Sequence, residues 1–279
     1  MPELPEVETV RAGAEPHLHG RRLCGVELRR CDLRWPIPVA AVHDLVGRRC
    51  TGILRRSKYL LLHFDGRGAP VALVHLGMSG HFAVETTAAR RRRPEWQKHE
   101  HWRMDFGARL VRFSDPRRFG VLDVVPGIGL ARHRLLAGLG QEPLLPGCDG
   151  AFLQRISRGK KASVKSLLMD GRLLVGVGNI YASEACWRAR VRPRRAAGSL
   201  TRAECAALVA AVQSVLRAAI AAGGTSFRDF KGVDEGAGYL QRVLRVYDRG
   251  GAPCRRCGTR IRRTQDGGRS TYWCAGCQR

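Results

Sequence analysis

Four cysteines near the C-terminus restrict the fold of this chain more than any other feature of its sequence. Cys254 and Cys257 form one C-x2-C pair, and Cys274 and Cys277 form a second pair after sixteen intervening residues. Each pair can place two thiolates on one metal ion, and two pairs complete a closed tetrahedral zinc site. Gly267-Gly268 between the pairs predicts the turn of a β-hairpin. We therefore expect one structural Zn²⁺ without a catalytic role, because a closed site has no open position; a redox dithiol or disulfides are the alternatives.

The charge of the chain points to a nucleic-acid partner. The 279 residues carry a formal net charge of +25, and arginines spread along the whole chain supply most of it. This excess predicts a folded basic surface that binds a polyanion, although a bias toward arginine codons would account for part of it. Arginines also surround the predicted zinc hairpin, and Arg269 follows its turn. We expect Arg269 to contact DNA; zinc ribbons that bind proteins are the alternative.

Neither a membrane span nor a secretory signal is predicted. The sequence shows no apolar run of about 18 residues. Its N-terminus lacks a basic segment followed by an apolar core. The six cysteines outside the zinc motif are dispersed, and we interpret them as free thiols in a reducing cytosol.

Apolar patterning divides the chain into a strand-rich first half and a helix-rich second half. A helix is predicted over Pro5–His17, and short apolar runs separated by glycine-rich turns predict strands at 59–64, 71–76, 102–106, 110–113 and 121–125. A capping box at Thr201–Glu204 opens an apolar pattern of helical spacing that ends at Gly223-Gly224. Shorter helices are predicted at 151–158 and 164–170.

These patterns predict an α+β fold class. We expect an N-terminal β-sandwich with an N-terminal helix, a C-terminal helical domain and a four-cysteine zinc-finger hairpin. The segment 143–150 is rich in proline and glycine and marks a boundary. The predicted domains are therefore 1–142, 151–238 and 239–279.

The N-terminus carries groups suited to covalent catalysis. Removal of Met1 would leave Pro2 with a free secondary amine, which forms a cationic iminium when it attacks a sugar carbon. An α-amine titrates well below a lysine, so more of it is neutral and nucleophilic near neutral pH. Glu3 and Glu6 place two carboxylates beside it that can move protons. The alternative is that proline and the acids only open a helix.

Motifs along the whole chain carry a resemblance to a known family. They are Met1-Pro-Glu-Leu-Pro-Glu-Val-Glu-Thr9, Leu76-Gly-Met-Ser-Gly80, Asp115-Pro-Arg-Arg-Phe-Gly120, Gly176-Val-Gly-Asn-Ile-Tyr-Ala-Ser-Glu184 and the terminal zinc motif. In this order they resemble the bacterial formamidopyrimidine-DNA glycosylases. The resemblance implies excision of oxidised purines (8-oxoguanine and formamidopyrimidines) from duplex DNA, followed by β,δ-elimination at the abasic site.

The same resemblance assigns the catalytic residues. Pro2 is implied to be the nucleophile on C1′ and Glu3 the acid and base at the sugar. Glu6 is implied to hold the environment of the amine. Lys58 is implied to reach the site and the adjoining phosphate; from the residues alone, a solvated lysine beside a strand is the better interpretation.

A target base must leave the duplex stack, so residues that fill the gap are expected. Met78 and Phe119 lie in turns, and the resemblance implies that they and Arg117 wedge into the helix and hold the orphaned cytosine. Arg118 is implied to lie near the backbone. Apolar wedges beside arginines suit a kinked duplex, although an isolated methionine or phenylalanine would more often be packed in a core.

Phosphate contacts are expected from the second half of the chain. Glycines before a helix let backbone N–H groups approach an anion, and Gly176-x-Gly178-Asn179 has this pattern. The resemblance implies a helix–two-turn–helix element in which Asn179 and Arg269 hold the phosphates flanking the lesion. Lys165 and Tyr181 are implied to lie near the bound nucleotide, and His75 to bind phosphate. Glu184 could act at the site or be structural.

Three features depart from the pattern or are left open. Ser166 stands where many relatives have proline, and the glycine-rich segment 231–238, where a lesion-capping loop is expected, differs from the common pattern. These departures leave the preferred lesion open. The run Arg90–Arg93 either adds DNA affinity or is solvated.

Two other functions remain as alternatives. One is an endonuclease VIII-like glycosylase for oxidised pyrimidines, and the other is a noncatalytic zinc-containing DNA-binding protein. We expect damaged double-stranded DNA as the partner, a monomer, and a place at the nucleoid in a bacterial cytoplasm.

Overall fold

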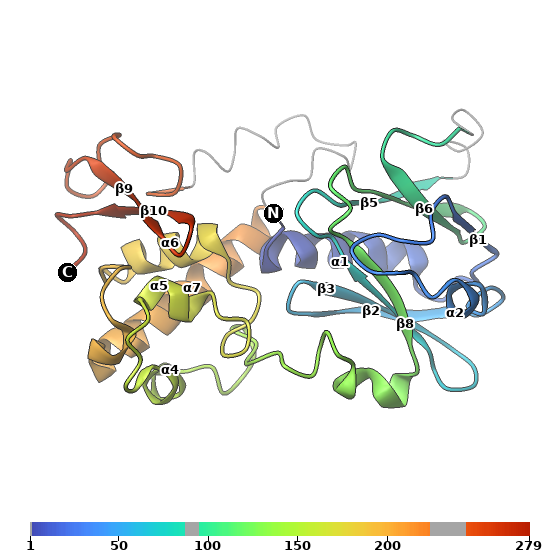
Figure 1. Cartoon of the computed structure of the whole chain (residues 1–279), viewed down its shortest axis with the longest axis horizontal. Coiled ribbons are helices and arrows are strands. Elements are labelled where there is room, and N and C mark those ends of the chain that lie inside the picture. Colours follow the sequence, from blue (N-terminus) through green and yellow to red (C-terminus); the bar gives the residue numbers. More distant parts are fainter. Residues whose placement is uncertain (1, 87–94, 224–243) are drawn as a thin grey trace. The chain divides into compact units, whose positions relative to one another are not determined.

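The computed structural model describes residues 2–86, 95–223 and 244–279 (Figure 1). These residues form two compact units. The N-terminal unit contains Pro2 and Glu6–Ala137, and the C-terminal unit contains Glu3–Pro5, 138–223 and 244–279. Met1, the arginine run at 90–93 and the whole of the expected lesion-capping segment at 231–238 lie outside the described residues, as does Gly224. The three predicted domains stay a prediction.

Two antiparallel four-stranded sheets form the N-terminal unit, as predicted for its β-sandwich (Figure 1). The first sheet has the order β1-β6-β7-β5 and consists of β1 (Gly25–Leu28), β6 (Glu100–Asp105), β7 (Arg109–Ser114) and β5 (His81–Thr86). The second sheet has the order β2-β3-β4-β8 and consists of β2 (Cys50–Arg56), β3 (Tyr59–Phe64), β4 (Val71–His75) and β8 (Val121–Val125).

One apolar core joins these sheets to the N-terminal helix α1 (Leu4–Leu18). Along β3, Leu60 and Leu62 point to this core, as the two-residue period of a strand requires. Trp102 and Phe113 stack with ring centroids 5.0 Å apart in the same core. The short helix α2 (Val39–His43) and the 3₁₀ turn η1 (Gly127–Arg132) complete the unit.

The predicted strands are found within a few residues of their expected ends, but β1, β2 and β5 were not predicted. β1 has only four residues, all half-buried, and β2 mixes apolar residues with threonine, glycine and arginine without a regular two-residue period. Two polar residues of β6, His101 and Arg103, are buried. Arg103 of β6 and Arg112 of the neighbouring β7 both pair with the buried Glu100, so these charged side chains compensate one another.

The C-terminal unit is helical and ends in a hairpin. Its elements are α4 (Gly150–Ser157), α5 (Val164–Leu168), α6 (Asn179–Arg188), η2 (Ala197–Ser199), α7 (Arg202–Ala221), β9 (Ile261–Asp266) and β10 (Arg269–Cys274). α7 packs on α4 and α6, and β10 packs on α6. The capping box is confirmed, because the Thr201 hydroxyl accepts the Glu204 N–H and the Glu204 carboxylate accepts the Thr201 N–H.

By length and composition α7 could cross a membrane, although the sequence has no uninterrupted apolar run at this place. Charged residues at its start and near its end interrupt the run, but the mean hydropathy of the helix stays as high as that of a membrane span. Leu208, Val212 and Leu216 of this helix lie in the core of the C-terminal unit. Its apolar face is therefore covered by protein, as in the core helix of a globular domain.

Candidate active site and nucleic-acid interface

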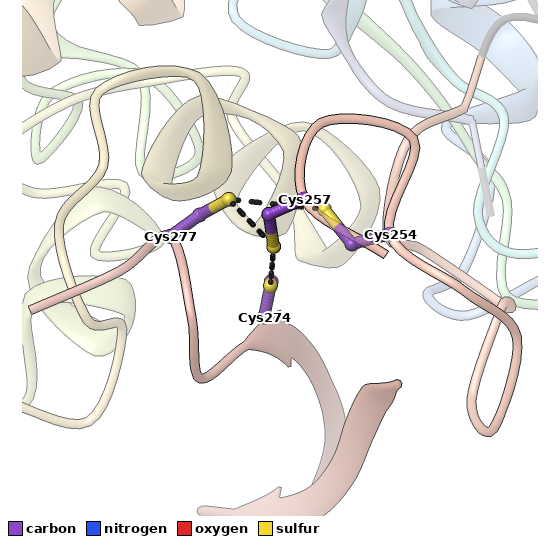
Figure 2. A group of neighbouring side chains, drawn as sticks. All are labelled: Cys254, Cys257, Cys274 and Cys277. Atoms are coloured by element: carbon purple, nitrogen blue, oxygen red, sulfur yellow. Dashed lines mark hydrogen bonds between the residues drawn. The ribbon is translucent and has the colours of Figure 1, made fainter. Parts of the chain in front are cut away.

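The four cysteines of the predicted zinc module come together at the base of the β9–β10 hairpin (Figure 2). Their sulfur atoms all lie within 4.8 Å of one another, and no two are bonded as a disulfide. Zn–S bonds of about 2.3 Å place the sulfurs of a tetrahedron roughly 3.8 Å apart. The Cys254–Cys277 and Cys257–Cys274 sulfur distances are 3.8 and 3.4 Å. The donor set fits one structural Zn²⁺ that leaves no position for a substrate.

Three residues predicted to contact the DNA lie near the Ser270 carbonyl of β10. The Lys165 ammonium donates to the Ser270 carbonyl at 2.9 Å and to the Thr271 hydroxyl at 2.7 Å. The Asn179 amide donates to the same Ser270 carbonyl at 3.1 Å. Arg269 precedes this residue and is exposed. The structure therefore brings Lys165 of α5, Asn179 of α6 and Arg269 of the hairpin together, although they are far apart in the sequence.

Lys165 is the cation of this group whose charge depends on pH. Its side chain is 2% exposed. The pKa of Lys165 is lowered to about 8, chiefly by burial and in part by the charge of Arg269, while Cys186, Asp266 and Glu3 act to raise it. Lys165 is thus mostly charged at pH 7 and mostly neutral at pH 9.

This titration predicts a loss of DNA affinity at alkaline pH. A phosphate binds the ammonium form, so above pH 8 binding must also protonate Lys165, and affinity should fall up to about tenfold from pH 8 to pH 9. The dissociation constant of a duplex with an abasic-site analogue, measured across this range, checks the prediction. Lys165→Gln should lose the pH dependence and the exposed Lys160→Gln should keep it. Identical pH profiles for all three proteins would contradict the assignment.

The amide groups that begin α6 hold the carboxylate of Glu3. Glu3 accepts the Gly178 N–H at 2.7 Å and the Ile180 N–H at 3.0 Å, with the Tyr181 N–H at 3.5 Å. The sequence pattern predicted an anion at this helix start, and it suggested a phosphate. In the structure these N–H groups bind an anion of the chain itself, and they fix the Glu3 carboxylate at the positive end of the helix. Tyr181 is buried in the core of the C-terminal unit.

Two glycines make room for this arrangement. A Cβ at Gly178 would lie 2.3 Å from the Glu3 carboxyl carbon, and a Cβ at Gly176 would lie 2.7 Å from Leu4. Gly176 also has a positive φ of 77°, and its carbonyl accepts the Leu4 N–H at 3.0 Å. The glycines are therefore needed for the approach of the N-terminal residues as well as for any approach of phosphate.

We expect Gly178→Ala to lower the single-turnover rate of base excision roughly a hundredfold, because the new methyl group must displace the Glu3 carboxylate. Gly171→Ala is a matched control, since a Cβ at Gly171 meets no atom within 4 Å and its φ is not in the left-handed region. Equal excision rates for Gly178→Ala and Gly171→Ala would show that the position of this carboxylate does not matter.

Glu184 has a structural position. Its buried carboxylate accepts the backbone N–H groups of Arg245, Val246 and Tyr247 at 2.8–3.1 Å. Burial raises the pKa of Glu184, while these hydrogen bonds lower it. Of the two roles considered for Glu184, the geometry supports the anchoring of residues 245–247 to α6.

In the N-terminal unit, the two predicted wedge turns lie against each other. A Cβ at Gly77 would be 2.6 Å from the Gly120 nitrogen, so the turns approach backbone to backbone. Met78 is 41% exposed on the first turn and Phe119 is 40% exposed on the second. The Arg117 guanidinium lies over the Phe119 ring, 4.7 Å from its centroid. Neither apolar side chain is packed in a core, and both are available for contact with a partner.

Asp115, for which the sequence predicted no role, holds these turns together. Asp115 is fully buried, and its carboxylate accepts the Ser79 hydroxyl at 2.5 Å, the Arg117 N–H at 3.2 Å and the Gly120 N–H at 2.7 Å. Its place before Pro116 in a turn was the available signal, since aspartate side chains often accept backbone N–H groups two residues on. Asp115 thus fixes the backbone that presents Arg117 and Phe119; Arg118 has a positive φ of 54° in the same turn.

His75 ends β4 beside these turns and is neutral at physiological pH. The pKa of His75 is lowered to about 4, chiefly by burial and in part by the charges of Lys58 and Arg34, while Asp115 acts to raise it. The His75 Nδ1 atom accepts the Gly77 N–H at 3.0 Å. Since Nδ1 is the acceptor, the ring proton is on Nε2, where it can donate to a phosphate without a charge.

The remaining predicted catalytic residues lie in the N-terminal unit. Glu6 is buried in the first turn of α1, and Pro2 is half-buried just before it. Lys58 is half-buried in the two-residue turn between β2 and β3. Ser57 of this turn has a positive φ of 56°.

The unusual Ser166 takes part in a hydrogen-bonded bridge to the zinc hairpin. Its N–H donates to the Ser163 hydroxyl at 3.1 Å, which caps α5, and the two hydroxyl oxygens are 2.9 Å apart. The Ser163 hydroxyl also lies 2.5 Å from the Asp266 carboxylate. Because a carboxylate only accepts, Ser163 donates to Asp266 and accepts from Ser166. A proline at position 166 could make neither contact.

Comparisons with known proteins agree along the whole length. Residues 1–122 match the family model of the formamidopyrimidine-DNA glycosylase N-terminal domain, and 139–231 match that of the formamidopyrimidine-DNA glycosylase H2TH domain. Residues 251–279 match a zinc finger found in FPG and IleRS. The formamidopyrimidine-DNA glycosylases of Thiobacillus denitrificans and Methylococcus capsulatus are 48% and 47% identical to the chain, with both chains covered completely.

Solved structures show the same likeness. The Lactococcus lactis enzyme in complex with DNA containing N7-benzyl-Fapy-dG matches with a TM-score of 0.88 at 29% identity, over 100% of both chains. Its complex with DNA containing an abasic site matches with a TM-score of 0.87 over 99% of both chains.

Proposed function

The chain belongs to the formamidopyrimidine-DNA glycosylase family, and we propose that its substrate is duplex DNA carrying an oxidised purine. It is a DNA glycosylase and an abasic-site lyase, with 8-oxoguanine and formamidopyrimidines as target bases. The observation that carries this proposal is the fixed position of the Glu3 carboxylate. Glu3 follows Pro2 in the chain, and the first N–H groups of α6 hold its carboxylate. The same helix begins with Asn179, next to Lys165 and the hairpin arginine.

The reaction follows from these groups. The Pro2 amine attacks C1′ as the base departs with a proton, and the amine loses its own proton. The C1′–O4′ bond then opens and O4′ takes a proton, and the resulting iminium makes the C2′ hydrogens acidic. Loss of a C2′ proton expels the 3′ phosphate, and a second elimination expels the 5′ phosphate. In this proposal Glu3 moves protons at the sugar, Glu6 shapes the environment of the amine, and Lys58 contacts the site and its phosphate.

The other proposed contacts hold the DNA. Asn179 and Arg269 bind the phosphates next to the lesion, and Lys165, Tyr181 and His75 support the bound nucleotide. Met78, Arg117 and Phe119 fill the space that the extruded base leaves, with Arg118 near the backbone. Two exposed apolar side chains beside a guanidinium suit this role, because an apolar wedge lowers the cost of unstacking.

Borohydride trapping tests the proposal directly. Purified protein is incubated with an 8-oxoguanine:cytosine duplex and borohydride, and the crosslink is mapped by mass spectrometry. A reduced adduct at Pro2 is expected, and it would also show that Met1 has been removed. An adduct only with oxidised-pyrimidine duplexes would favour the endonuclease VIII-like alternative. Tight binding without any adduct, despite a free Pro2, would favour a noncatalytic DNA-binding protein.

Zinc removal is expected to weaken DNA binding. Loss of the metal frees the hairpin that carries Arg269 and the Ser270 carbonyl, so the affinity for an abasic-analogue duplex should fall roughly 10- to 100-fold, as for one charge-assisted hydrogen bond. The single-turnover rate at saturating enzyme should change little. Chelation, with metal loss verified by elemental analysis, provides the measurement; unchanged affinity in the metal-free protein would contradict the prediction.

We infer that the protein acts as a monomer at the nucleoid of a bacterial cytoplasm. A short site on one duplex needs no second subunit, and the relatives from Thiobacillus denitrificans and Methylococcus capsulatus are bacterial proteins. Sedimentation of the protein alone and with one duplex tests the monomer.

A further inference from the structure

A hydrogen bond connects the zinc site to α6. The indole Nε1 of Trp187, in the last turn of α6, donates to the Cys254 sulfur at 3.4 Å. The Arg256 N–H donates to the same sulfur at 3.4 Å. Trp187 is 8% exposed, so water does not compete freely for its N–H group. Its position in the helix gave no sign of this contact, since an indole on an apolar face is expected to pack in a core.

Arg256 holds the indole in place. Its guanidinium lies over the Trp187 ring, 4.0 Å from the centroid, and donates to the Trp187 carbonyl at 3.2 Å. The ring packs among residues of the hairpin core, including Val246 and Ile261. A side chain held on both sides keeps its N–H directed at the sulfur with little loss of rotamer freedom on metal binding.

We propose that Trp187 is a positioning residue of the zinc centre, whose indole N–H stabilises the Cys254 thiolate and ties the metal to α6. Four thiolates around Zn²⁺ carry a net negative charge, and N–H donors to sulfur spread that charge. Removing a group that hydrogen-bonds to a metal ligand commonly costs about 10- to 100-fold in metal affinity or activity. The first amides of this same helix hold Glu3, so the metal and the carboxylate stabilise opposite ends of one element.

Trp187→Phe tests the proposal because it keeps an aromatic ring and removes the donor. Trp273→Phe is the matched control: Trp273 precedes Cys274, is 4% exposed, and its Nε1 has no hydrogen-bond partner among the described residues. Zinc affinity is measured by competition with a chromogenic chelator. We expect about tenfold weaker binding for Trp187→Phe and unchanged binding for Trp273→Phe.

The Co²⁺-substituted proteins give a second readout that packing alone would not change. A hydrogen bond lowers the energy of the sulfur lone pair, so its loss should move the thiolate-to-cobalt charge-transfer band of Trp187→Phe to lower energy. The band of Trp273→Phe should stay in place. Equal zinc affinity and an unshifted band for Trp187→Phe would overturn the proposal, as would equal weakening in both variants.

If Trp187→Phe does not fold, benzothienylalanine at position 187 replaces only the N–H by sulfur in a ring of the same shape. The same shift and the same loss of affinity are expected, and native behaviour would overturn the proposal. These measurements need no DNA, so their outcome is independent of the proposed function.

Discussion

Replacing Pro2 by glycine is expected to lower base excision and borohydride trapping at least about a hundredfold. Glycine leaves a primary amine, which forms a neutral imine that must be protonated before it withdraws electrons, whereas proline forms the cation directly. The measurement is the single-turnover excision rate on an 8-oxoguanine:cytosine duplex. Binding to a duplex with an uncleavable abasic analogue should be unchanged, because the proposed phosphate contacts come from other residues.

A second variant removes the nucleophile altogether. An alanine inserted between Met1 and Pro2 turns the proline nitrogen into an amide, which has no available lone pair, and displaces the free amine by one residue. Trapping at the proline should disappear while DNA affinity remains. Unimpaired turnover in both the glycine and the insertion variants would refute the assignment of the nucleophile.

The Glu3→Gln variant is expected to bind damaged duplex normally and to excise the base roughly 10²- to 10⁴-fold more slowly, the range for loss of a positioned acid or base. The structure adds a second reason for a large effect. The Glu3 carboxylate accepts N–H groups through both oxygens, from Gly178 and from Ile180. A glutamine has one acceptor oxygen, so its amide nitrogen would face a backbone donor.

Glu8→Gln provides a matched control for this substitution. Glu8 lies on α1, the helix that Glu3 precedes, and its carboxylate pairs with Arg11 and Arg55. The change also removes one negative charge but does not touch the α6 amides, so excision should stay near the native rate. Equal single-turnover rates for Glu3→Gln and the native protein would count against a role for Glu3 in proton transfer.

Local features of the chain could be predicted from sequence because they depend on neighbouring residues. The capping box at Thr201, the apolar run of β3 and the turn at Gly267-Gly268 each arise within a few residues. The zinc site could also be predicted, since the two cysteines of each C-x2-C pair are neighbours in the sequence. β1, β2 and β5 were missed because no strong local pattern marks them.

Only part of the candidate site could be predicted from the sequence. The sequence named Glu3, Lys165 and Asn179 through family motifs, and the proposed roles still rest on that resemblance. It did not indicate that Asp115 joins the two wedge turns. Nor did it indicate that Ser166 and Ser163 form a chain of hydrogen bonds to Asp266 of the hairpin, or that the Trp187 indole donates to a zinc ligand. Each of these contacts joins two segments that are distant in the chain, and nothing in the sequence of one segment indicates that it contacts the other.

The sequence by itself determined the chemical groups of this protein: a proline that can become the N-terminus, two nearby carboxylates, four paired thiols and a strong excess of arginine. Only the tertiary structure decided which charges meet and which are buried. Glu3 binds amides 175 and 177 residues away, and burial lowers the pKa of Lys165 to about 8. The physical reason is that bonding potential belongs to each residue, whereas contact between distant residues and exclusion of water follow from how the whole chain packs.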